Sequence, residues 1–96
     1  MAEDNKKYVS MAVNFISSMD MEEFKKNISD IDALYKKLIV MKDFLPIQVK
    51  IMLKSSKVDD FIDILKQNSK EKFEFVEKEN KMDELKVLFS NLISEI

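Results

Sequence analysis

The sequence contains no glycine and a single proline, Pro46, among its 96 residues. Glycine is the residue that most often supplies left-handed backbone at helix ends and tight turns, and proline is the residue that most often stops a helix. A chain without glycine has to build its caps and turns from Ser, Asp, Asn and Pro46. The backbone therefore has few points at which a regular segment ends, and helices are the expected structure.

Histidine, cysteine and arginine are absent as well, together with threonine and tryptophan. Without glycine there is no phosphate-cradling loop of the usual kinds, and without histidine or cysteine there is no ordinary zinc site or neutral-pH histidine base. Without arginine there is no planar group for bidentate binding of phosphate or carboxylate. We therefore expect a protein that is not an enzyme and that holds no cofactor and no metal.

Length and charge set further bounds. Ninety-six residues are enough for one core, so residues 1–96 are expected to form a single helical domain. Hydrophobic residues make up 46% of the chain and charged residues 35%, which suits a folded protein with a soluble surface. The net charge of −2 argues against binding to nucleic acid or to an anionic membrane, since both usually need a basic excess.

The sequence also predicts a compartment. The longest uninterrupted apolar run, residues 38–41, is far shorter than the roughly 20 residues that span a bilayer. Residues 1–5 are acidic and polar, unlike a secretory signal, and the chain has no cysteine for disulfides. We expect a cytoplasmic protein without a membrane span. Lysine used without arginine is typical of an AT-rich genome, such as that of a low-GC bacterium, its phage or a virus.

Apolar residues recur at helical spacing through almost the whole chain. They predict an all-α fold, a compact bundle of about five helices. The first helix is expected over residues 4–18. A long second helix should begin after its cap Asp20 and end at Pro46, because proline disfavours helical geometry in the residue before it.

Two short central helices are predicted after Pro46. The first covers residues 46–54, and the second begins after a cap at Ser56, with Asp59 returning the bond to the cap backbone. Asn68 tolerates left-handed geometry and should end that helix, with Ser69 as the next cap. A long fifth helix is then expected over residues 70–94.

Two interruptions stay open. Ser29 and Asp32 match a capping box, so the second helix has an alternative in which it breaks near Asn27. In the last helix, the polar run at residues 77–81 either faces solvent or marks a break. We expect continuity, because the apolar residues keep one helical phase across the run: Phe75, Met82, Leu85, Phe89, Leu92 and Ile96.

The most informative functional signal is an excess of apolar residues. Residues 38–41 surround a complete helical turn, and a turn that is apolar on all sides has to be buried by the core or by a partner. The C-terminal helix repeats the pattern. The candidate interaction surface consists of the apolar residues at these two places: Leu38, Met41, Phe44, Leu45, Phe89, Leu92, Ile93 and Ile96. We expect a small regulatory or inhibitory protein that binds a protein partner through helix faces and forms a homodimer.

The sequence also allows two other functions. A helix-turn-helix at residues 46–67 would make the protein a nucleic-acid-associated regulator, with Lys50, Lys54 and Lys57 near the phosphate backbone. The acidic residues of the second helix in that segment would repel phosphate. The same acids, Asp59, Asp60 and Asp63, resemble the DDxxD string of magnesium-dependent isoprenoid-type synthases. A magnesium site of that kind needs a second acid-rich helix, which the sequence does not offer. Acids in the first turn of a helix are stabilised by the helix dipole, and this explains the string more simply.

Overall fold

The computed structural model describes the backbone of residues 2–96 and the side chains of residues 6–96. Over this range the chain forms helices and no strand, which confirms the all-α prediction. The helices are α1 (Ala2–Ser17), α2 (Met21–Ser29), α3 (Ile31–Asp43), α4 (Ile47–Lys54), α5 (Val58–Asn68), α6 (Lys70–Lys78) and α7 (Met82–Glu95). The predicted count of five is wrong, because each of the two long helices is divided in two.

The first division lies at Asp30. Its backbone leaves helical geometry (φ −126°, ψ 80°), and its carboxylate accepts a hydrogen bond from the Ala33 N–H at 3.3 Å. Its own N–H donates to the Lys26 carbonyl at 3.2 Å, so one short polar residue ends α2 and caps α3. The break therefore lies three residues beyond Asn27. The predicted cap of α2 is confirmed, since Asp20 accepts from the Glu23 N–H at 2.8 Å.

The second division lies at Asn80, and the predicted continuity across residues 77–81 is wrong. Asn80 has a positive φ of 58°. The N–H of Lys81 donates to the Val76 carbonyl at 2.9 Å, and the N–H of Asn80 donates to the Glu77 carbonyl at 3.1 Å. These two bonds form a Schellman motif, in which asparagine takes the left-handed position that glycine usually holds.

The two short central helices are present, with small shifts at their starts. Pro46 is the residue before α4, with an extended backbone, and is not its first helical residue. Lys57, not Ser56, is the cap residue of α5, and its N–H lies 3.4 Å from a carboxylate oxygen of Asp60. The bonding acid is thus Asp60 and not Asp59. The Ser56 hydroxyl instead donates to the Met52 carbonyl at 3.2 Å.

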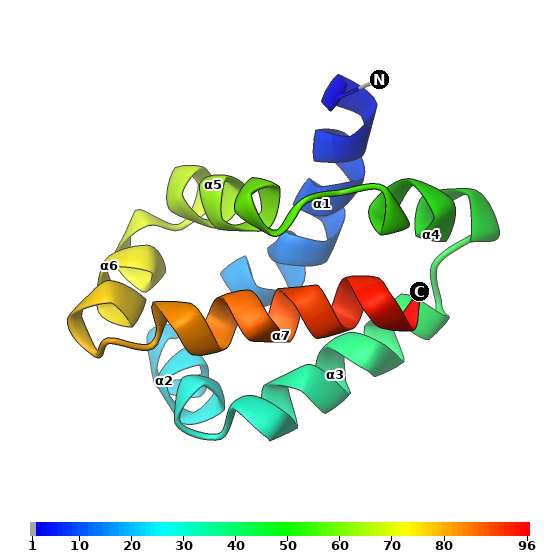
Figure 1. The fold of residues 1–96 in the computed structure, drawn as a ribbon. Helices are drawn as coiled ribbons and strands as arrows, with labels where there is room; N and C mark the ends of the chain where they lie inside the picture. The colour runs from blue at the N-terminus through cyan, green and yellow to red at the C-terminus, as the bar shows by residue number, and fades with distance from the viewer. Residues whose placement is uncertain (1) are drawn as a thin grey trace.

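One continuous cluster of buried apolar side chains, drawn from all seven helices, forms the core. Figure 1 shows α7 running across the front of the molecule, α3 below it, and α1 crossing behind at a steep angle. α1 makes its most extensive contact with α5. The rings of Phe61 and Phe89 stack with centroids 4.7 Å apart and join α5 to α7. The radius of gyration of 12.4 Å is that of a compact chain of this length.

A buried lysine ties α6 to α1. Lys72 is 7% exposed, and its Nζ donates to the Ser17 carbonyl at 3.0 Å. That carbonyl is at the C-terminus of α1, where the helix dipole favours a cation. The ammonium also lies 6.0 Å from the centre of the Phe24 ring. Its charge is therefore compensated by a carbonyl and an aromatic face.

Candidate interaction surface

Several large apolar side chains lie outside the core. Among the described side chains, the exposed large hydrophobic residues are Met11, Val40, Phe44, Ile47, Ile51 and Val87. Four of the six are close in sequence, from the end of α3 to the middle of α4. Phe44 is 83% exposed, which is unusual for a phenylalanine in a folded chain. Neighbouring apolar residues in solvent are a mark of a binding surface.

An open groove of about 520 Å³ lies between α1 and α3. Its lining residues are Phe15, Lys36, Lys37, Val40, Met41 and Phe44. Lys36, Val40 and Phe44 follow at intervals of four residues and therefore share one side of α3. Phe15 supplies the part of the lining that comes from α1. Because lysine stems are hydrocarbon, the lining is almost wholly apolar with charges at the tips of the lysines.

The charges beside the groove are positive. Lys37 donates from Nζ to the Asn27 side-chain oxygen at 2.9 Å, which places its head over α2. Lys36 is exposed and forms no ion pair with any side chain of residues 6–96. The next lysine along α3, Lys42, is paired with Asp43 at 3.0 Å. Two ammonium groups therefore accompany the apolar lining.

The predicted surface residues differ in how far the structure exposes them. Leu38, Phe89 and Leu92 are at most 1% exposed, because α3 and α7 pack against each other and against the core. The structure assigns these three to the core instead of the surface on which we expected them. The half-buried members are Met41, Leu45, Ile93 and Ile96, and the exposed member is Phe44. Of the predicted set, Met41 and Phe44 line the groove.

The residues that sequence reasoning missed have a recognisable signal. Val40 lies outside the buried stripe of α3, which contains Leu34 and Leu38. Ile47 and Ile51 likewise lie outside the buried pair of α4. An apolar residue that repeats at i, i+4 on the face opposite the core stripe has no partner within the chain.

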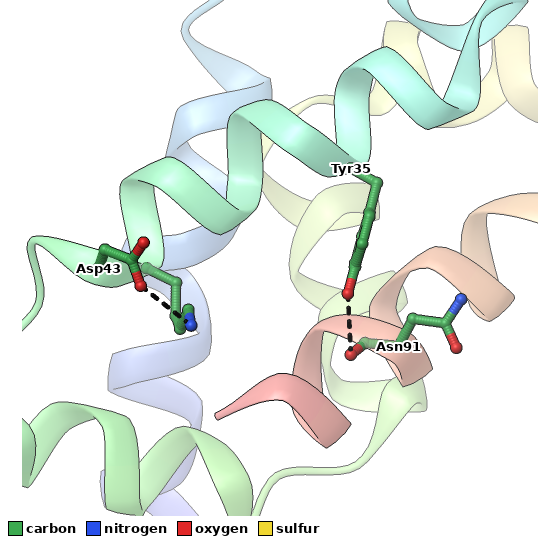
Figure 2. Close-up of polar contacts among 4 residues, drawn as sticks. Tyr35, Asp43 and Asn91 are labelled. Atoms are coloured by element: carbon green, nitrogen blue, oxygen red, sulfur yellow. Dashed lines mark hydrogen bonds and ion pairs between the residues drawn. The ribbon is translucent and has the colours of Figure 1, made fainter.

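Tyr35 links α3 to the C-terminal helix. Figure 2 shows it pointing from α3 to α7, where its hydroxyl lies 3.5 Å from the Asn91 backbone carbonyl. Burial raises the pKa of Tyr35 above its ordinary value of 10.0, Glu95 raises it further, and Lys42 opposes the shift. An ordinary phenol is already protonated at neutral pH, and the raised pKa extends that range further into alkaline solution, which works against a role as a base.

The acids of α5 are dispersed. Asp59 and Asp63 are exposed, and Asp60 accepts from the Lys57 N–H. Within the side chains of residues 6–96, no three acidic residues are close enough together to hold a metal ion. The same exposed acids lie on the helix that a helix-turn-helix at residues 46–67 would bring to DNA. Neither alternative function gains a site from this geometry.

The sequence matches no protein-family model, and neither a curated protein nor a solved structure matches it. Over residues 2–96, none of the helices has the length and apolar character needed to cross a membrane. The exposed apolar residues from α3 to α4 are therefore the main indication of function.

Proposed function

We propose that this chain is a small, non-catalytic regulatory or inhibitory protein that acts through protein–protein contact and associates with a second copy through α4. The observation that supports self-association is the pair Ile47 and Ile51. They lie one helical turn apart and are 65% and 59% exposed. Burying two such side chains provides a favourable free energy of about 1.5–3 kcal/mol each, before the cost of association.

The charge distribution favours a second copy at this face. A two-fold contact brings the same residues of both chains together, so its centre has to be free of like charges. The exposed residues at the start of α4 are uncharged: Pro46, Ile47, Gln48 and Ile51. The one lysine among them in sequence, Lys50, is half-buried. The groove beside Lys36 and Lys37 does not meet this requirement, because it would set four ammonium groups against one another.

The contact is small. α4 has eight residues and is about 12 Å long, so two crossing copies bury less than the roughly 800 Å² per partner of a standard interface. We therefore expect a weak dimer, with a dissociation constant on the order of micromolar.

Size-exclusion chromatography with light scattering over a concentration series tests this proposal. The mass should rise from 11.3 kDa toward twice 11.3 kDa as the concentration increases. Ile51→Lys should return the protein to the monomer mass. Val87→Lys is the matched control, because Val87 is 58% exposed on α7 and lies beside residues of α3. A monomer at every concentration would contradict self-association.

A nucleic-acid regulator is the alternative. Lys54 and Lys57 are exposed at the turn between α4 and α5, but so are Asp59 and Asp63. Binding to duplex DNA at low salt, with an affinity that falls steeply as salt is added, would support this alternative over the proposed function.

A further inference from the structure

We propose that the groove between α1 and α3 binds an amphipathic helix of a different protein, one that carries acidic residues beside its apolar face. This inference rests on the proposed function only in that the protein acts through protein contact. The surface is another one, and the partner is not a second copy. The two proposals can therefore fail separately.

The dimensions of the groove suit a helix. Along α3 the lining runs from Lys36 to Phe44, which is eight residue steps or about 12 Å. Two turns of a partner helix cover the same length and present apolar side chains at i, i+3 or i+4, and i+7. Val40, 58% exposed, and Phe44, 83% exposed, are the apolar contacts that α3 offers to such anchors. Phe15 contributes the apolar contact from α1.

The lysines determine which helix fits. Lys36 has no acidic partner among the side chains of residues 6–96. Lys37 donates one hydrogen bond to Asn27, and an ammonium group has three N–H donors, so two remain for a ligand. Asp43, the acid next to Phe44 in sequence, is already paired with Lys42. A helix with Glu or Asp flanking its apolar stripe would therefore pair with Lys36 and Lys37 as its anchors enter the groove.

Other occupants fit less well. A second copy placed groove to groove would bring Lys36 and Lys37 against the same lysines of its partner. A small polar ligand would find few polar groups to orient it, since those of the lining are chiefly the two ammonium tips. An anionic membrane also satisfies the lysines, but the net charge of −2 disfavours binding to it.

The test measures binding of two synthetic, fluorescently labelled helical peptides of about four turns by anisotropy. Both carry leucine at i, i+3, i+4 and i+7. One carries glutamate beside the leucines and the other carries lysine at the same positions. We expect the glutamate peptide to bind at least about tenfold more tightly, and its affinity to fall as NaCl is raised.

Variants locate the contact. Val40→Ser should weaken binding of the glutamate peptide severalfold, whereas Val87→Ser should not, although Val40 and Val87 are both 58% exposed. Lys36→Glu should weaken it about threefold to tenfold, whereas Lys86→Glu, at an exposed lysine of α7, should not. All four positions are exposed, and circular dichroism checks that each variant is folded.

Three results would overturn the inference. Equal affinity for both peptides would contradict the proposed preference of the groove for acidic residues. Absence of binding to either peptide would exclude an amphipathic helix as the occupant of the groove. Binding to vesicles of phosphatidylcholine and phosphatidylserine that is lost in Lys36→Glu, without peptide binding, would make an anionic membrane the occupant. None of these results changes the mass measured in the self-association test, so the proposed function is judged separately.

Discussion

Lys37 of α3 donates a hydrogen bond from its Nζ to the side-chain oxygen of Asn27 in α2, with 2.9 Å between the two atoms. Asn27 is 4% exposed, and its amide nitrogen donates to the Glu23 carbonyl at 2.8 Å. The amide nitrogen thus bonds to a carbonyl of α2, and the amide oxygen bonds to a side chain of α3. This contact spans the break at Asp30 and also fixes a lysine that lines the groove.

Removal of either partner should destabilise the fold. Lys37→Met leaves a buried amide oxygen without a donor, and Asn27→Ala removes all three hydrogen bonds of the amide, which join it to Lys37, to the Glu23 carbonyl and to the Met19 sulfur. We therefore expect each substitution to lower the free energy of unfolding by about 1–2 kcal/mol. Urea denaturation of both variants and of the double variant gives the coupling energy, expected at about 0.5–2 kcal/mol. Lys36→Met is the control, expected to change stability by less than about 0.5 kcal/mol. Additive effects in the double variant would show that the two residues do not interact.

Asn80 should be replaceable by glycine and by little else. At φ 58° a side chain with a branched Cβ clashes with the backbone, whereas glycine has no Cβ. We expect Asn80→Gly to leave thermal stability unchanged or slightly raised, and Asn80→Val to lower it by about 1–2 kcal/mol. Glu79→Val, one residue earlier at φ −83°, is the comparison that separates the left-handed backbone from general intolerance of valine. Similar losses at both positions would contradict the explanation.

Asn80 also shows why the last helix was mispredicted. The apolar residues on both sides of it keep one helical phase, so periodicity alone cannot distinguish a continuous helix from two helices that each face the core. The break is encoded in a single asparagine, whose left-handed tendency is weaker than that of glycine. Asp30 is a similar case, since the aspartate between Ser29 and Ile31 becomes a cap only when the helices beside it pack at an angle. Pro46 and Asp20 act through local chemistry, and they were predicted correctly as helix boundaries.

Phe89 should behave as a core residue. Its ring stacks on Phe61 at 4.7 Å and is 1% exposed, so Phe89→Leu should lower the free energy of unfolding by about 1–2 kcal/mol through lost contact and stacking. Val87→Ala, two residues earlier on the exposed side of α7, should change it by less than about 0.5 kcal/mol. Chemical denaturation measures both. An unchanged stability in Phe89→Leu would return this residue to the list of surface candidates.

The candidate surface was predictable only in part. Apolar excess around residues 38–41 indicated the segment that contributes Val40 and Met41 to the groove, because a helix apolar on all sides presents more apolar surface than one core contact can cover. It did not show which side faces the core. That side is set by the packing of α3 on α7, which buries Leu38 and leaves Val40 exposed. Local spacing separates the two apolar faces of α3, but only the packing against α7 decides which of them is buried.

Tyr35 should make stability depend on pH in alkaline solution. Burial raises the pKa of Tyr35 above the ordinary 10.0 in the folded chain. Glu95 adds a smaller rise, and Lys42 lowers the pKa by less still. Above pH 10 the unfolded chain has lost this proton while the folded chain still holds it, so stability falls as pH rises toward the folded pKa. Above pH 10, the free energy of unfolding of the natural sequence should therefore fall more steeply with pH than that of Tyr35→Phe. Glu95→Gln should lower the pKa of Tyr35, as measured by phenolate absorbance.

The burial of Lys72 has a chemical consequence. The chain contains 16 lysines, and Lys72 is the one whose side chain the fold encloses, with its ammonium against the Ser17 carbonyl. Amine-reactive reagents should label the other lysines in the native protein and reach Lys72 only when α6 separates from α1. The labelling rate of this single amine, followed by mass spectrometry, then reports how often the molecule opens.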